Sequence, residues 1–170
     1  MALTDGAASV ASGRVSFALG LRGACLTLDT ACSASLVGLH VGAFEASSGS
    51  ADSALCGGVN AADHGASRQC AAAGMISPNG RCHTFDARAD GYARGDGALV
   101  VAVGGAPENY AALAGAAARA DGRSASLTAP SGVAQEALLR AVAAVVRAVA
   151  AGESKLVLEA HGTGTALGDP

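Results

Sequence analysis

The chain has 170 residues, of which 51% are hydrophobic, 3% aromatic and 15% charged, and it contains 24 glycines and no tryptophan. Its net charge of −3, without any run of lysine or arginine, argues against nucleic acid as a partner. No apolar stretch approaches the ~20 residues needed to cross a bilayer, and residues 1–12 lack the basic leader and apolar core of a secretory signal. This length suits one domain, and the many small residues predict closely packed layers of helix and strand.

Five cysteines are spread along the chain without a CxxC pair or a zinc-ligand spacing, so no metal site is predicted. An odd number of cysteines without a secretory signal indicates free thiols in the cytoplasm or another reducing intracellular compartment. Four of the five are expected to be small hydrophobic residues of the core.

A buried strand is predicted over residues 24–28, because a short apolar run lies between a glycine and an aspartate. A helix is predicted after Cys32, because apolar side chains recur there at helical spacing on one face, and the serine-rich stretch 47–50 ends it. A second buried strand is predicted over residues 53–61, where paired glycines allow close approach of another backbone.

Residues 62–94 are polar and irregular apart from a short alanine-rich piece near 69–73, and a loop of this length is usually functional or partly structured. A strand is predicted over residues 97–103. Residues 110–119 fit either a strand or a helix, because their alanine content does not discriminate between the two.

Ser131 is predicted to cap the clearest helix of the chain, whose leucines and valines share one face as far as Ala151, before Gly152 ends it. A strand is predicted over residues 155–160, and the loop 161–165 begins at its C-terminal end. This order of strands and helices indicates a layered α/β architecture.

Cys32 and His161 are each predicted to lie just past the end of a buried strand, where α/β sheets place their chemistry. Cys32 also opens a helix, and the unpaired N–H groups there favour a nucleophilic thiolate and can stabilise an oxyanion. Judged by position alone, Cys32 is equally compatible with a buried structural cysteine and with a nucleophile. At position 161, position alone favours a structural loop histidine over a catalytic one.

Residues 29–40, with the sequence DTACSASLVGLH, resemble the nucleophile motif of β-ketoacyl synthase domains in type I polyketide and fatty acid synthases. Further stretches resemble the family in the same order, and they are ALCGGVN at 54–60, SPNGRC at 77–82 continuing through ADGYARG at 89–95, DGRS at 121–124 with LTAP at 127–130, and EAHGTGT at 159–165 with GDP at 168–170. Several ordered motifs are a specific signal. The stretches ADGY at 89–92 and EAH at 159–161 look more like polyketide synthases than like stand-alone bacterial-type fatty acid enzymes.

The resemblance implies an α/β fold of the thiolase-like kind, with layers in the order αβαβα, in an incomplete form. Residues 1–170 would be a partial ketosynthase domain, with about 1–105 in the N-terminal half and about 110–170 at the start of the C-terminal half. The family's second catalytic histidine and its lysine are expected beyond Pro170. We therefore expect this stretch alone to be unstable and inactive.

The resemblance implies that Cys32 and His161 are catalytic. Cys32 would accept an acyl chain from an acyl carrier protein, and His161 would bind the thioester oxygen of a malonyl-type extender. Decarboxylation of the extender gives an enolate that attacks the acyl thioester, which is a decarboxylative Claisen condensation. Thr163 and Thr165 would hold the carrier's phosphopantetheine arm. No directly bound cofactor is implied, and the full-length protein is expected to form a homodimer.

Other interpretations stay open. The chain could come from the ketosynthase of a type I fatty acid or polyunsaturated-lipid synthase. A thiolase-like acyltransferase that uses coenzyme A is disfavoured by EAHGTGT at 159–165, and a Cys/His hydrolase by the lack of an identifiable residue to orient the histidine. A non-catalytic fragment or dimerisation scaffold is the alternative of another class, although such proteins usually lose the nucleophile and Cys32 is retained.

Overall fold

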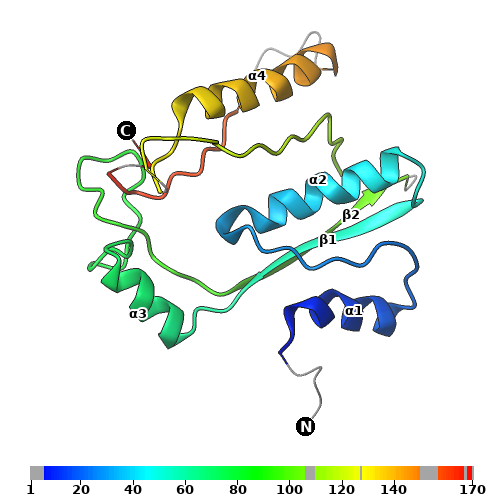
Figure 1. Ribbon diagram of the computed structural model, residues 1–170, viewed down its shortest axis with the longest axis horizontal. Helices are drawn as coiled ribbons and strands as arrows, with labels where there is room; N and C mark the ends of the chain where they lie inside the picture. The colour runs from blue at the N-terminus through cyan, green and yellow to red at the C-terminus, as the bar shows by residue number, and fades with distance from the viewer. Residues whose placement is uncertain (1–5, 106–109, 127, 150–156, 167, 170) are drawn as a thin grey trace. The chain divides into compact units, whose positions relative to one another are not determined.

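The structure is a computed structural model that describes residues 6–105, 110–126, 128–149, 157–166 and 168–169. Its elements in chain order are α1 (Ala8–Leu19), the short 3-10 helix η1 (Ala31–Ser33), α2 (Ala34–Ser47), β1 (Ser53–Asn60), α3 (His64–Ala72), β2 (Gly97–Gly104) and α4 (Gly132–Val149) (Figure 1). The chain divides into two compact units, Met1–Gly58 with Leu99–Ala111 and Val59–Ala98 with Ala112–Pro170, and each is described by itself.

The strands β1 and β2 pair in a two-stranded sheet. A Cβ built on Gly57 would lie 3.1 Å from the carbonyl oxygen of Leu99, and a Cβ on Gly104 would lie 2.7 Å from the Cα of Ser53. The start of one strand therefore faces the end of the other, and the strands run antiparallel. The positions of both strands confirm the predictions from the sequence, with one end of each strand differing by one residue. The predicted burial of the first strand is wrong, because only Cys56 of its residues is buried.

Helix α2 packs against β1 through glycines (Figure 1). Gly42 of α2 is buried and has no room for a Cβ beside the Sγ of Cys56 in β1. Near the other end of the contact, a Cβ on Gly58 of β1 would lie 2.7 Å from the Cβ of Ser35 in α2. The helix predicted after Cys32 is confirmed, and these two close approaches hold it against the strand.

The buried strand predicted over residues 24–28 is wrong, because these residues form no strand and residues 24–27 are exposed. A strand needs a neighbour for its N–H and C=O groups, and no described segment supplies one here. Of the strand predicted over 155–160, residues 155–156 lie outside the described residues, and residues 157–160 form no strand. Cys32 and His161 therefore follow irregular chain.

Several helical features differ from the predictions. The sequence does not predict α1, and α3 is longer than the alanine-rich piece near 69–73. Helix α3 begins at His64, because the carboxylate of Asp63 accepts a hydrogen bond of 2.9 Å from the N–H of Ala66, as a helix N-cap does. Residues 110–119 form neither a strand nor a helix.

Helix α4 begins where the sequence predicts. The Oγ of Ser131 accepts a hydrogen bond of 3.3 Å from the N–H of Ala134, and Asp121 accepts one of 2.8 Å from the N–H of Ser131. The predicted end of this helix at Ala151 and Gly152 lies outside the described residues. None of the described helices combines the length and the hydropathy that a membrane crossing requires.

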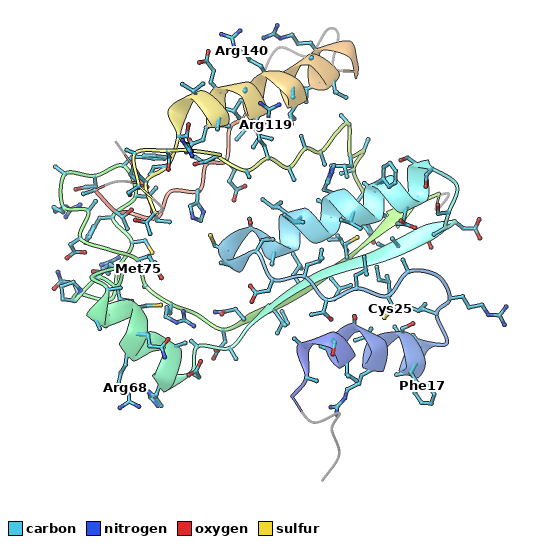
Figure 2. The ribbon with its side chains drawn as sticks, in the orientation of Figure 1. Phe17, Cys25, Arg68, Met75, Arg119 and Arg140 are labelled. Carbon is cyan, nitrogen blue, oxygen red and sulfur yellow. The ribbon has the colours of Figure 1, made fainter. Side chains whose placement is uncertain are left out.

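Few apolar side chains are buried. Among the described residues, Cys56 is the only buried hydrophobic one, with 7% of its surface exposed. Phe17 projects from α1 (Figure 2), and 91% of its surface is exposed. Val59 and Leu99 in the strands are 84% and 72% exposed. Apolar faces of this extent are normally covered by further elements of a fold, so the described elements are parts of a larger layered structure.

Candidate active site

Cys32 lies in η1, which runs directly into the first turn of α2, and its thiol is exposed. Ser33 is the N-cap residue of α2, but its side chain does not cap the helix. Its Oγ donates instead toward the carbonyl oxygen and the Oγ1 of Thr30, both at 2.9 Å. Ser33 therefore does not cap the N–H groups of the first turn of α2. A helix end can bind an anion only where such N–H groups are not occupied by a capping side chain.

The residue before Cys32 has an uncommon backbone conformation. Ala31 has a φ of +54°, in the left-handed region. The Oδ1 of Asp29 accepts a hydrogen bond of 3.1 Å from the N–H of Ala31. Residues 29–33 thus form a tight turn that the side chains of Asp29 and Ser33 hold from either end.

In the second unit, the segment 161–165 forms a loop that depends on its glycines. Gly162 and Gly164 have φ values of +54° and +70°. A Cβ on Gly162 would lie 2.6 Å from the Cγ2 of Thr84, and one on Gly164 would lie 3.0 Å from the backbone nitrogen of His83. Both the backbone conformation and the close approach of the preceding loop therefore require glycine at these positions.

Hydrogen bonds join this loop to the long loop 75–94. Thr84 donates its hydroxyl to the carbonyl oxygen of Gly162 at 2.7 Å, and Gly91 donates its N–H to the carbonyl oxygen of Gly164 at 3.0 Å. The long loop is itself pinned at its ends by a bridge between Ile76 and Tyr92. The sequence predicts that the long loop is functional or partly structured, and these contacts confirm that it is partly structured.

Asp169 links the two loops through its carboxylate. Its Oδ2 accepts hydrogen bonds from the N–H of Gly164 at 2.8 Å and from the N–H of Phe85 at 3.1 Å. Burial raises the pKa of the Asp169 carboxyl, but the hydrogen bonds from Phe85, Gly164 and Thr163 outweigh burial and hold the pKa below its ordinary value. The ionised form is therefore the one that organises the loop.

Thr163 and Thr165 lie side by side, with 3.0 Å between their hydroxyl oxygens. Thr163 also donates toward the Oδ1 of Asp169 at 3.4 Å. A Cβ on Gly168 would lie 2.5 Å from the Oγ1 of Thr163 and 2.6 Å from that of Thr165. The structure thus brings together the two threonines proposed from the sequence, on one face of a glycine turn.

His161 begins the same loop, and its side chain is exposed. Cys32 belongs to the first unit, whereas His161, Thr163 and Thr165 belong to the second.

Of the four cysteines predicted to be core residues, Cys56 confirms the prediction, and Cys25, Cys70 and Cys82 do not. Only Cys56 is buried, and burial raises the pKa of its thiol. Cys25 and Cys82 are exposed, and Cys82 accepts a hydrogen bond of 3.2 Å from the N–H of Ala93. Cys70 lies 3.7 Å from a guanidinium nitrogen of Arg94. No group of three or more potential metal ligands lies together in the described parts of the chain.

Sequence reasoning places Asp29 and Asp169 within motifs but assigns them no function. The turn role of Asp29 could have been predicted from the sequence, because a short carboxylate side chain commonly accepts a hydrogen bond from the backbone two residues further along. Asp169 gives no such local signal for Phe85, because their contact spans 84 residues.

The sequence matches two family descriptions that adjoin along the chain. Residues 1–109 match "Beta-ketoacyl synthase, N-terminal domain", and residues 110–170 match "Beta-ketoacyl synthase, C-terminal domain".

Curated relatives include large multidomain proteins. The chain is 44% identical to a phenolphthiocerol/phthiocerol polyketide synthase of Mycobacterium tuberculosis, in a match that covers 98% of this chain and 8% of that protein. It is 40% identical to erythronolide synthase EryA3 of Saccharopolyspora erythraea, in a match that covers 99% of this chain and 6% of that protein. The chain therefore spans less than a tenth of the length of these relatives.

Solved structures with the same fold include ketosynthases. The ketosynthase from module 6 of the bacillaene synthase of Bacillus subtilis matches with a TM-score of 0.87 and 32% identity, over 98% of this chain and 31% of that one. An oxazolomycin ketosynthase domain of Streptomyces albus matches with a TM-score of 0.80 and 32% identity, over 96% and 29%. These matches confirm the predicted α/β fold of the thiolase-like kind, in partial form.

Proposed function

The chain belongs to the β-ketoacyl synthase family as a partial ketosynthase domain of the type I polyketide synthase kind, and we propose that the protein carrying it catalyses decarboxylative Claisen condensation in polyketide biosynthesis. The observation that carries this proposal is the exposed thiol of Cys32 on the turn that leads into α2, whose N-cap residue Ser33 makes no side-chain cap hydrogen bond. The polyketide synthases among the relatives favour this pathway over fatty acid synthesis.

In the loading step, the Cys32 thiolate attacks the carbonyl carbon of an acyl thioester on the carrier protein. A new C–S bond forms to Cys32, and the bond to the phosphopantetheine sulfur breaks, which releases the carrier thiol after protonation. Charge that develops on the carbonyl oxygen is stabilised by nearby backbone N–H donors, and the first turn of α2 carries donors of this kind that Ser33 leaves uncapped.

In the condensation step, a malonyl-type extender loses CO2, and the electron pair of the broken bond forms an enolate. The enolate carbon attacks the acyl carbon on Cys32, so that a C–C bond forms, the C–S bond breaks and the thiolate is regenerated. A neutral imidazole N–H of His161 would hydrogen-bond the extender's thioester oxygen, where negative charge develops. The product is a β-ketoacyl chain on the carrier.

The loop 161–165 suits contact with the phosphopantetheine arm. The hydroxyls of Thr163 and Thr165 are adjacent and only part-buried, and each hydroxyl has both donor and acceptor capacity for the arm's amide and carbonyl groups. Asp169 and the long loop hold these threonines in place. The arm is part of the carrier protein, so the proposed chemistry uses no separately bound cofactor.

The remaining features of the proposal concern assembly and location. We expect the acyl carrier protein as the partner and a homodimer of the full-length protein. All five cysteines lack disulfide partners, which supports a reducing intracellular compartment. The halves about 1–105 and about 110–170 remain the expected division of the ketosynthase domain.

The test uses the full-length polypeptide that contains this stretch, incubated with a labelled acyl thioester and analysed by intact-protein and peptide mass spectrometry. The native protein is expected to gain one acyl group on the peptide that contains Cys32, and Cys32→Ala is expected to gain none. Cys25→Ala is the matched control, because Cys25 is also exposed in the same unit. An acyl group that still attaches to Cys32→Ala would remove the nucleophile assignment.

A second measurement separates the enzyme from a scaffold and from an acyltransferase that uses coenzyme A. Labelled malonyl groups on carrier protein are supplied to the acyl-loaded enzyme, and incorporation into a β-ketoacyl product is measured. His161→Ala is expected to load Cys32 normally but to lose condensation. Loading without any condensation by the native protein would contradict the proposed activity.

A further inference from the structure

The turn before Cys32 holds a backbone conformation that its own residue disfavours. Ala31 has a φ of +54°, where the Cβ of an alanine crowds the following carbonyl group. Non-glycine residues persist in this region only when their surroundings hold them there. The backbone next to Cys32 therefore needs a local restraint.

Two side chains supply this restraint. The Oδ1 of Asp29 accepts a hydrogen bond from the N–H of Ala31 at 3.1 Å, which is the geometry by which aspartate stabilises a turn over the next residues. On the other side of Cys32, Ser33 donates its hydroxyl to Thr30 and its N–H to the carbonyl oxygen of Thr30 at 3.3 Å. The carbonyl oxygen of Ala31 also accepts the N–H of Ala34, but among these side-chain contacts only the one from Asp29 acts on Ala31 itself.

From this geometry we infer that Asp29 is a positioning residue for Cys32. Its carboxylate holds Ala31 in the left-handed conformation, and this conformation sets the orientation of the peptide that joins Ala31 to Cys32 at the start of α2. Asp29 acts through the backbone and does not contact the reacting atoms. This inference rests on the proposed function of Cys32 as the acyl-carrying nucleophile.

A hydrogen-bond restraint is distinguishable from an effect of charge. Asparagine keeps an Oδ1 acceptor of nearly the same size and removes the negative charge, whereas alanine removes the acceptor. The inference therefore predicts that Asp29→Asn behaves like the native enzyme and that Asp29→Ala does not. Asp52→Ala is the matched control, because Asp52 is an exposed aspartate of the same unit outside the turn.

The experiment measures acylation of Cys32 in the full-length polypeptide, with an acyl thioester of a small pantetheine analogue at several concentrations. For Asp29→Ala the maximal acylation rate is expected to fall about tenfold or more, as the loss of a hydrogen bond to a charged group implies. The KM for the thioester should change little, because Asp29 orients the nucleophile. Asp29→Asn and Asp52→Ala should stay within about twofold of the native rate.

A backbone substitution keeps the inference testable if Asp29→Ala folds poorly. Glycine adopts positive φ without steric cost, so Ala31→Gly in the Asp29→Ala background is expected to recover much of the lost rate. Native-like acylation by Asp29→Ala would overturn the inference, and so would equal loss in Asp29→Asn and Asp29→Ala. Failure of the native enzyme to load Cys32 is a different result, and it would contradict the proposed function.

Discussion

The side chain of Asp169 and the backbone of Phe85 are joined by a hydrogen bond of 3.1 Å across 84 residues of sequence. The same carboxylate oxygen, Oδ2, accepts the N–H of Gly164 at 2.8 Å. One oxygen atom thus holds together the loop of the proposed catalytic histidine and the long loop that precedes it. Phe85 has a φ of +55°, which shows that this junction also includes a backbone conformation in need of support.

Replacement of Asp169 by alanine is expected to loosen the loop 161–165 and to slow condensation. Misplacement of positioning groups by about 1 Å can cost on the order of 100-fold in rate, so we expect a loss of about 10- to 100-fold in the full-length enzyme. Acyl loading of Cys32 should be retained, because Asp169 holds the loop of His161, which is proposed to act in the condensation step. Single-turnover rates for the two steps measure this split, and equal loss of both would contradict it.

The stability of this loop should depend on pH through Asp169. Hydrogen bonds depress the pKa of its carboxyl in the folded state, whereas an unfolded aspartate has a pKa of about 4. The stabilising effect is therefore fully present above about pH 4 and is lost as the pH falls from there through the lower folded pKa. Hydrogen exchange at Phe85 and Gly164, corrected for intrinsic rates, is expected to accelerate in that window, and Asp169→Asn should abolish the dependence.

Glycine at position 162 is expected to be needed for its close approach to Thr84 as well as for its positive φ. Gly162→Ala places a Cβ at 2.6 Å from the Cγ2 of Thr84, at a φ of +54°. Gly80→Ala is the matched control, because Gly80 has a φ of +64° and open space around its missing side chain. Both variants bear the cost of positive φ, about 1–2 kcal/mol, but only Gly162→Ala should also slow condensation. Equal effects of the two on condensation would exclude a role for the contact with Thr84.

The sequence predicts best those features that depend on local patterns. Apolar spacing after Cys32 predicts α2, short strand-like segments predict β1, with its paired glycines, and β2, and the hydroxyl of Ser131 marks the start of α4. The family resemblance likewise places the proposed site residues, because motifs are local in sequence.

Features that depend on distant partners are predicted poorly. The apolar run 24–28 has the composition of a strand, but strand formation requires a neighbouring strand, and the described chain offers none. The role of Asp169 is hidden for the same reason, because its partner Phe85 belongs to a distant loop. Helix α1 begins after Ala7 without a side-chain cap, so it lacks the signal that marks α4.

The contact between α2 and β1 gives a sharp test of the packing that supports Cys32. Gly42→Ala brings a Cβ into the Sγ of Cys56, whereas Gly38→Ala in the same helix meets nothing within 4 Å. Overpacking of this kind typically costs roughly 1–3 kcal/mol, while alanine at an open helical position is favourable by about 1 kcal/mol. Chemical denaturation of the full-length domain should therefore order the variants as Gly38→Ala, native and Gly42→Ala, from most to least stable.

The same contact can be relieved from the strand side. Cys56→Ala removes the Sγ that Gly42→Ala would meet, although Ala54 would still lie 3.2 Å from the new Cβ. The double variant is therefore expected to recover part of the stability that Gly42→Ala loses, in a double-mutant cycle. Strict additivity of the two substitutions would indicate that α2 and β1 do not touch at this point.

The isolated 170-residue stretch is expected to lack a cooperative fold. Among its described residues only Cys56 is a buried hydrophobic residue, while Val59 and Leu99 on the sheet are 84% and 72% exposed. Burial of apolar surface is the main favourable contribution to folding, and here it is too small to offset the entropy of ordering the chain. Circular dichroism should show no sharp thermal transition, and the hydrophobic dye ANS should bind strongly. A monomer that melts cooperatively without binding the dye would mean that these apolar faces are covered within the stretch itself.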